Sequence, residues 1–280
     1  MKLYTKIADL SDWKILSSFY LNIYRERHPL QNFDFFNWQY SDPHHGRSFI
    51  LTDGKKIYGH VGAYFEDGYA WIINVYLDPD HRGKGWVGQL YEMARKFGYP
   101  LVATSANEAG LGLYRKMGWI RYSNLERFVL YNPAHNQLPA EKLIQPVQLS
   151  TKIHPPESSL HYWRQPGILG SQLADGSTGI AQYPEGGFRF TEIRDILQAE
   201  KEVWTLGFLW CDYITSWNDP LIDTLLSNGW ISQSRSKFPW FLKPVDTEKP
   251  FMVSFLSEDP IDKKFIVRRY HSDHGRVGSL

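Results

Sequence analysis

The chain has very few cysteines and no excess of charge of either sign. Cys211 is the single cysteine among 280 residues, so an internal disulfide is excluded. Lys and Arg number 31 and Asp and Glu number 30, which leaves a formal net charge of +1. Such a balance provides no strong sequence-independent attraction to a phosphate backbone, so nucleic acid is not the expected partner.

Long apolar runs and a signal sequence are also missing. The longest apolar candidates are interrupted by Asn74 or Asp212, well short of the roughly 20 residues that cross a bilayer. The beginning of the chain, MKLYTKIADLSDWK, lacks the basic segment and apolar core of a signal peptide. These absences predict no membrane contact and a cytoplasmic protein.

What is present suggests two folded domains. A length of 280 residues fits two domains of roughly 100 to 150 residues each, and 42% hydrophobic residues suffice for two cores. The stretch 133–156 is rich in proline, glutamine and lysine with weak periodicity, as in a linker. We therefore expect one domain at residues 1–135 and another at 150–280.

The second half repeats part of the first. TSANEAGLGLYRKMGWI, residues 104–120, aligns without a gap with TSWNDPLIDTLLSNGWI, residues 215–231. Weaker markers keep the same order: FNWQYSDP around Trp38 against HYWRQP around Trp163, and Asp53-Gly54 against Asp175-Gly176. This self-similarity indicates a tandem duplication.

The first half reads as strands followed by alternating helices and strands. Runs at 48–52, 57–65 and 70–77 are typical of strands, and Asp-Gly pairs between them mark hairpins. A helical spacing then runs from Val87 to Phe97. A short strand at 101–105, a helix capped by Asn107 and ended by Gly118, and a pair of strand patterns ending at Tyr131 complete the unit.

The turn Arg82-Gly83-Lys84-Gly85-Trp86-Val87-Gly88 lies between a predicted strand and a predicted helix. Its backbone N–H groups would lie at the positive end of a helix dipole, which suits a pyrophosphate. It lacks the Gly-Lys-Ser/Thr of a P-loop and the following acidic residue of a dinucleotide fingerprint. A glycine-rich turn alone can also be purely structural.

Two linked motifs carry a family resemblance. LDPDHRGKGWVGQLYEMA resembles the acetyl-CoA motif of GNAT N-acetyltransferases, Arg/Gln-x-x-Gly-x-Gly/Ala, and NEAGLGLYRKMGWI resembles its partner, Asn-x-x-Ala-x-x-x-Tyr-x-x-x-Gly-Phe. The resemblance covers about residues 2–133, and its specific part lies between 72 and 120. It implies an α+β fold of two tandem GNAT-like domains, each a mixed, mostly antiparallel sheet flanked by helices, with a degenerate second copy.

The resemblance also implies acetyl-CoA as cosubstrate and assigns residues to it. Backbone groups near Leu77 would hold the pantetheine arm, and Asn107 and Tyr114 would lie beside the thioester. The backbone amides of the turn would hold the pyrophosphate, and the expected residues there are Arg82, Gly83, Lys84, Gly85, Trp86, Val87 and Gly88. Val87 departs from the small residue of the family pattern.

Transfer by direct attack of a neutral amine on the thioester needs a proton donor for the leaving thiolate. Tyr114 suits this catalytic role, although a tyrosine packed on a helix is the alternative. Ile73 stands where many relatives place a glutamate, so the base is open: His60, Glu66, Asp67 or water. No metal site is expected, because the histidine pairs lack a second ligand pair at suitable spacing.

The second copy lacks the features needed for CoA. Between residues 193 and 210 there is no glycine-rich turn, and Leu225 occupies the position of Tyr114. The copy then completes a core or an interface, or it forms one wall of the acceptor cleft. Cys211 lies in an apolar run without a paired histidine, which favours a buried structural thiol.

The acceptor is predicted from a second resemblance. Residues 29–62 are similar to the N-terminal part of tandem-GNAT nucleotide-sugar N-acetyltransferases of bacterial surface-polysaccharide pathways. This implies a small-molecule amine acceptor, the amino group of a dTDP- or UDP-linked deoxyamino sugar, with Trp38 and Tyr40 stacking on it or else packing in the core. A homodimer stays open. The alternative functions are an aminoacyl-tRNA-dependent transferase of tandem GNAT fold and a non-catalytic CoA-binding module.

Overall fold

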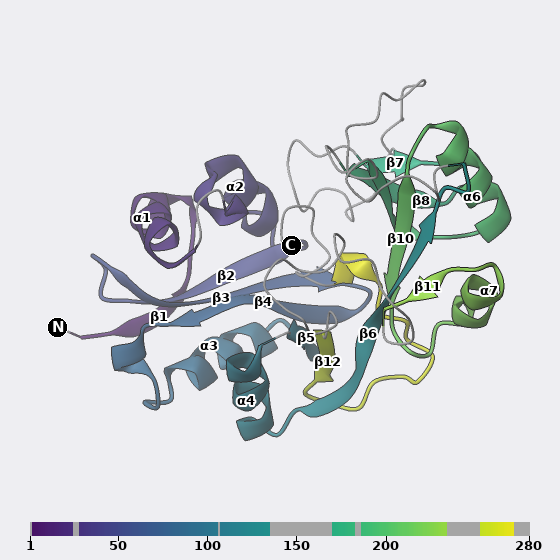
Figure 1. The fold of residues 1–280 in the computed structure, drawn as a ribbon. Helices are drawn as coiled ribbons and strands as arrows, with labels where there is room; N and C mark the ends of the chain where they lie inside the picture. Colours follow the sequence, from purple (N-terminus) through teal and green to yellow (C-terminus); the bar gives the residue numbers. More distant parts are fainter. Residues whose placement is uncertain are drawn as a thin grey trace.

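In a computed structural model, one continuous sheet runs through both halves of the chain (Figure 1). The structure describes residues 2–24, 28–105, 107–134, 170–182, 186–233 and 253–271. The sheet has 12 strands in the order β1-β2-β3-β4-β5-β12-β6-β10-β9-β8-β7, and β11 also pairs with β6. No helix in the described part of the chain is both long and apolar enough to span a membrane.

The first half supplies six strands with helices on both faces. The strands are β1 (Tyr4–Ile7), β2 (Gly46–Thr52), β3 (Ile57–Glu66), β4 (Tyr69–Leu77), β5 (Leu101–Ser105) and β6 (Ile120–Tyr131). Neighbouring strands among β1 to β5 are antiparallel except for the parallel pair β4 and β5. Helices α1 (Trp13–Ile23) and α2 (Phe33–Tyr40) cover one face, and α3 (Trp86–Arg95) and α4 (Glu108–Lys116) cover the other (Figure 1). Short 3-10 turns are η1 (Leu10–Asp12), η2 (Pro29–Gln31) and η3 (Pro79–His81).

The second half repeats this plan with fewer residues. Its elements are β7 (Gly170–Gln172), β8 (Thr178–Gln182), β9 (Gly187–Glu192), α6 (Ile196–Thr205), β10 (Trp210–Thr215), α7 (Leu221–Ser227), β11 (Ile231–Ser232), β12 (Val253–Ser257) and η6 (Arg269–His271). Strands β9 and β10 are parallel and joined through α6, as β4 and β5 are joined through α3. The mixed sheet flanked by helices is as predicted.

The repeated sequences occupy equivalent elements. Residues 104–120 run from the end of β5 through α4 to the start of β6, and residues 215–231 run from the end of β10 through α7 to β11. Gly118 and Gly229 both take positive φ, 79° and 84°, so each ends its helix in the left-handed conformation that glycine permits. The sequence repeat is therefore a repeat of structure.

Each half of the sheet is completed by a strand from the other half. β12 lies between β5 and β6, where it pairs with residues 120–125 of β6. Residues 126–131 of β6 pair with β10, and its residues 128–129 also pair with β11. The predicted pair of strand patterns ending at Tyr131 was wrong, because residues 120–131 contain no glycine or proline and form one strand that both units share. The boundary between 135 and 150 lies outside the described residues and stays a prediction.

Two cores lie on the two faces of the first half. Side chains alternate across each strand, so Val61, Ile72 and Ala103 face α3 and α4 whereas Ile50 faces α1 and α2. In the second half, Cys211 lies in the core beneath α6 and α7, and burial raises the pKa of its thiol. A structural role for this thiol, as the sequence suggests, agrees with that position.

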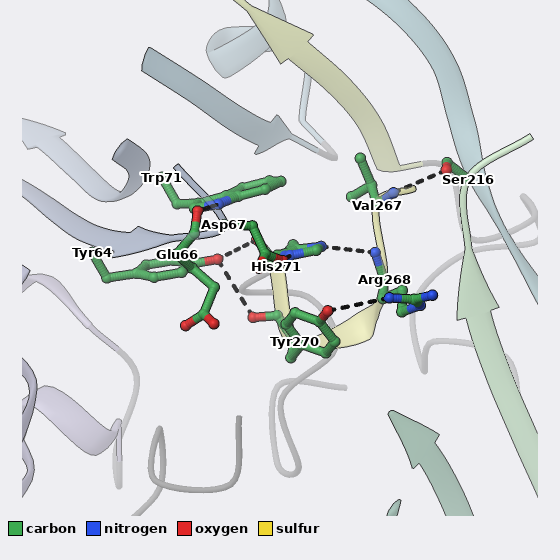
Figure 2. Close-up of polar contacts among 9 residues, drawn as sticks. All are labelled: Tyr64, Glu66, Asp67, Trp71, Ser216, Val267, Arg268, Tyr270 and His271. Carbon is green, nitrogen blue, oxygen red and sulfur yellow. Dashed lines mark hydrogen bonds and ion pairs between the residues drawn. The ribbon is translucent and has the colours of Figure 1, made fainter. Parts of the chain in front are cut away.

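Residues 268–271, which follow β12, are held against the β3–β4 hairpin by hydrogen bonds and ring stacking (Figure 2). The Tyr64 hydroxyl donates to the carbonyl oxygen of His271 at 2.6 Å, and the His271 ring stacks on Trp71 with centroids 4.6 Å apart. His271 Nδ1 accepts from the backbone N–H of Arg268 at 2.9 Å, so the proton lies on Nε2, which donates to Asp67 at 2.7 Å. These contacts fix the segment after β12 against the first half.

A buried charge cluster joins the same junction. Asp212 on β10 accepts from Arg127 of β6 at 2.7 Å and also pairs with Arg269 of η6. Burial by itself would raise the Asp212 pKa, but the guanidinium groups of Arg269, Arg127 and Arg189 hold it below its ordinary value. The carboxylate therefore stays ionised and ties three elements together.

Candidate active site

The sheet opens between β4 and β5. These parallel strands pair only from Ala70 opposite Leu101 to Ile72 opposite Ala103. β4 nevertheless continues to Leu77 without further pairing to β5, whose residues Val102 to Ser105 pair with β12 along the other edge. The carboxyl ends of the two strands therefore separate, which leaves the edge of β4 beyond Ile72 unpaired with β5.

The glycine-rich turn follows this opening directly. Gly83 and Gly85 have φ of 74° and 80°, and Gly85 is the N-cap of α3. A Cβ added at Gly83, Gly85 or Gly88 would meet no atom within 4 Å, so the backbone is uncovered on that side. Amide groups at an open helix N-terminus match the chemistry of a pyrophosphate. The turn thus fits the group that the sequence predicts there.

Two basic side chains of the turn brace it. Arg82 Nε donates to the carbonyl of Leu77 at 3.0 Å, and Lys84 Nζ donates to the carbonyl of Asp80 at 2.7 Å. Arg82 and Lys84 still place positive charge within the turn, although these nitrogens donate hydrogen bonds to backbone oxygens. Val87, the departure from the family pattern, packs against the core under α3 and α4. Its branched side chain is therefore accommodated away from the backbone of the turn.

Tyr114 lies in the interior between α3 and α4. Its hydroxyl accepts a hydrogen bond from the Tyr91 hydroxyl at 3.3 Å, and its ring lies 4.6 Å from that of Trp119. Burial raises the pKa of Tyr91 well above its ordinary value, so Tyr91 keeps its proton and acts as a donor. The sequence pattern does not single out Tyr91, because its spacing on α3 is that of an ordinary core residue.

Asn107 is the N-cap of α4, as predicted. Its Oδ1 accepts from the backbone N–H of Gly110 at 2.7 Å, and a Cβ on Gly110 would lie only 2.4 Å from the hydroxyl of Ser105. The end of β5 and the start of α4 are therefore tightly apposed. That Asn107 also lies beside a bound thioester stays a prediction.

A β-bulge interrupts β4 next to the opening. Asn74 and Val75 together oppose Val61, because the register changes between His60 opposite Tyr76 and Gly62 opposite Ile73. Asn74 has φ of 52°, a conformation that asparagine tolerates better than most residues. The one polar residue inside the apolar run WIINVYL was the available sequence signal for this bulge.

Three side chains hold the bulge. The carbonyl of Asn74 accepts from His60 Nδ1 at 2.9 Å and from the Tyr24 hydroxyl at 3.3 Å. The side-chain amide of Asn74 donates to the Tyr40 hydroxyl at 3.3 Å. A Cβ added to Gly62 would lie only 2.2 Å from the Tyr40 hydroxyl, so this position requires glycine.

The candidate bases lie away from the glycine-rich turn or are inaccessible. His60 is fully buried, and burial lowers its pKa to about 4. Glu66 and Asp67 lie at the β3–β4 hairpin, and Asp67 is bound to His271 (Figure 2). Residues 69–72 of β4 separate that hairpin from the opening between β4 and β5, about 13 Å at roughly 3.3 Å per residue. None of the three is placed to take a proton directly from an amine in the opening.

The two predicted acceptor residues lie on α2. Trp38 is partly buried and its ring lies 5.5 Å from that of Phe35. Tyr40 is buried against the bulge, as described above. Contact of either residue with an acceptor stays a prediction. The structure shows no group of three potential metal-binding side chains within the described ranges.

Residues 13–119 match the model of the acetyltransferase (GNAT) family. These residues make up less than half of the chain, and they resemble a GNAT acetyltransferase domain. The glycine-rich turn, the opening between β4 and β5, and Tyr114 all fall inside the matched residues. Acetyl-CoA is accordingly the cosubstrate, and the chain is an acetyl-CoA-dependent N-acetyltransferase. No curated protein matches the chain.

Some solved structures are similar to this protein over both halves of the chain. One is a conserved protein of unknown function from Enterococcus faecalis V583, 12% identical over 91% of this chain and 72% of that chain, with a TM-score of 0.55. Another is a GCN5-related N-acetyltransferase from Kribbella flavida, 14% identical over 79% and 66% of the chains, with a TM-score of 0.52. At such identities the likeness is one of fold, and it includes residues beyond 119.

Proposed function

We propose that this GNAT enzyme acetylates the primary amine of a small polar acceptor, the amino group of a dTDP- or UDP-linked deoxyamino sugar. The observation that carries the acetyl-transfer part is the opening between β4 and β5, followed at once by the uncovered glycine-rich turn at the N-terminus of α3. The acceptor class is supported by the resemblance of residues 29–62 and by the tandem fold.

The residues of the turn divide the work of binding in this proposal. When bound, acetyl-CoA supplies an activated acetyl thioester. Backbone N–H groups from Arg82 to Gly88 hold the pyrophosphate, and Trp86 and Val87 contribute through their amides. Backbone groups near Leu77 hold the pantetheine arm along the unpaired edge of β4. Asn107 and Tyr114 flank the sulfur.

Tyr114 donates its hydroxyl proton to the departing sulfur. The hydrogen bond from Tyr91 supports this role, because a donor directed at the Tyr114 oxygen stabilises the negative charge that the oxygen acquires. Since His60, Glu66 and Asp67 are buried or distant, the amine loses its proton to water. The acceptor therefore reacts as the neutral amine, in proportion to its fraction at the working pH.

Purified full-length chain with acetyl-CoA and a panel of dTDP- and UDP-amino sugars tests the proposal. Free thiol release should occur with one nucleotide-linked amino sugar, and matched nucleotide sugars carrying a hydroxyl in place of the amine serve as controls. Release with simple polyamines but with no nucleotide sugar would remove this acceptor class. Failure to bind acetyl-CoA together with binding of charged tRNA would favour aminoacyl transfer instead. Light scattering of the same sample tests for a homodimer.

A further inference from the structure

His60 is a fully buried polar side chain of β3 that contacts the bulge of β4. It projects from β3 toward α1, and both ring nitrogens have partners. Nδ1 faces the Asn74 carbonyl at 2.9 Å, while the hydroxyls of Tyr20 and Ser48 lie 2.9 and 3.0 Å from Nε2. The acetyl-transfer roles described above do not use this histidine.

The partners determine where the proton of His60 lies. A carbonyl oxygen can only accept a hydrogen bond, so Nδ1 must carry the proton and donate it. In the neutral ring Nε2 is then an acceptor, which suits two hydroxyl groups. Burial lowers the pKa to about 4, so the ring remains neutral near pH 7. His60 is thus a fixed donor to one backbone carbonyl.

That carbonyl belongs to the strained residue of the bulge. Asn74 has φ of 52°, in the left-handed region that non-glycine residues rarely adopt and that asparagine tolerates better than most. The Asn74 carbonyl and the Val75 N–H belong to one peptide unit. In a trans peptide these two groups point in opposite directions. The Asn74 carbonyl accepts from His60 and from Tyr24, so the Val75 N–H points away from both of these side chains.

We propose that His60 is a positioning residue for acetyl transfer: its donation to the Asn74 carbonyl holds the 74–75 peptide so that the Val75 N–H faces the acetyl oxygen. The inference rests on the proposed function, because it assumes that the acetyl group lies in the opening between β4 and β5. Tyr20 and Ser48 act behind His60 by keeping Nε2 unprotonated. The side chain of Val75 packs toward α3 and α4, on the other face of the sheet from His60.

Two substitutions separate positioning from packing. His60→Phe keeps a ring of similar size and removes the donor. His60→Asn loses ring volume but keeps a donor, since its amide nitrogen is as many bonds from Cα as Nδ1. The expected result is a fall in kcat of about 10- to 100-fold for His60→Phe, less than direct loss of an oxyanion donor. His60→Asn should recover a substantial part of this loss, and KM for acetyl-CoA should change less than threefold in both.

Ile50→Val is the matched packing control. Ile50 pairs across from His60 in the same core, so the variant loosens that core without touching Asn74. It should lower the melting temperature with little change in kcat. Unchanged kcat in His60→Phe, or greater loss in His60→Asn than in His60→Phe, would overturn the positioning role. An ionisation in the kcat profile between pH 6 and 9 that disappears in His60→Asn would also overturn it, since it would make His60 a base.

A backbone amide spectrum distinguishes failure of this inference from failure of the proposed function. If wild-type protein turns over no acceptor, the acetyl-transfer proposal fails in this assay. The Val75 amide resonance can still be compared between wild type, His60→Phe and His60→Asn, with and without acetyl-CoA. A shift in wild type and His60→Asn that is lost in His60→Phe supports positioning. The same response in all three proteins contradicts it.

Discussion

Replacing Gly85 by alanine should weaken CoA binding far more than the equivalent change at Gly98. The two glycines lie beyond opposite ends of α3 and have nearly identical φ, +80° and +78°. A Cβ at either position would meet nothing within 4 Å. The two variants therefore differ in where the strain lies, at the glycine-rich turn for Gly85→Ala and at the far end of α3 for Gly98→Ala.

The magnitude follows from the backbone conformation. An alanine in the left-handed region costs about 1 to 2 kcal/mol, so both variants should lose similar stability. At Gly85, relaxation of φ also turns the N–H groups of residues 84–86 away from the diphosphate. Loss of one charge-assisted hydrogen bond costs about 1.5 to 3 kcal/mol. The Kd for CoA should then rise about 10- to 100-fold in Gly85→Ala.

Calorimetric titration with CoA and thermal unfolding of both variants provide the comparison. Gly98→Ala should keep its Kd within about twofold of wild type, because a strained helix end remote from the turn changes no binding group. Equal Kd values for Gly85→Ala and wild type would refute the placement of the diphosphate on this turn. An equal loss of affinity in both variants would show a global effect of strain instead.

Three further predictions follow from the same structure. Tyr114→Phe should lower kcat about 100-fold, as expected for loss of a general acid, with CoA affinity within about threefold, measured by thiol release and calorimetry. A chain ending at Pro133 lacks β12 and should lose cooperative thermal unfolding in circular dichroism, because β5 and β6 then lose the strand between them. The folded pKa of His60, about 4, lies below the ordinary 6.5, so the unfolded chain binds more protons between these values and stability falls as pH decreases through them. This contribution is about 3 kcal/mol over the full interval, and urea unfolding of wild type and His60→Asn between pH 7 and 4.5 should show the variant with the flatter dependence.

Each of these three predictions has an outcome that would contradict the structural reasoning behind it. Unchanged kcat in Tyr114→Phe would leave Tyr114 as a packed tyrosine. A cooperative transition in the shortened chain would show that the first half folds without β12. Parallel stability curves for wild type and His60→Asn would mean that the pKa of His60 is the same in the folded and the unfolded protein, and hence that the ring is solvated in the native protein.

The parts of the site that follow one another in the chain could be predicted from the sequence. The glycine-rich turn and the capping of α4 by Asn107 depend on φ angles and caps within a few residues, and such requirements leave local signatures. The repeat was visible because Gly118 and Gly229 serve the same helix ending in both copies.

What depends on pairing between distant segments could not be predicted. Insertion of β12 between β5 and β6 joins residues more than 120 positions apart. The sequence pattern of residues 253–257 contains no signal that identifies β5 and β6 as the partner strands. The contact of His60 with Asn74 likewise depends on a register shift within the β3–β4 pair. A histidine and an asparagine in apolar strands indicate only that each requires a partner.

A crystal structure of the protein with CoA tests the central claim most directly. Phosphate oxygens should lie within about 3.2 Å of backbone nitrogens between Arg82 and Gly88, with the sulfur in the opening between β4 and β5 and near the Tyr114 hydroxyl. CoA bound elsewhere, or a sulfur on the far side of β4 from Tyr114, would contradict the account.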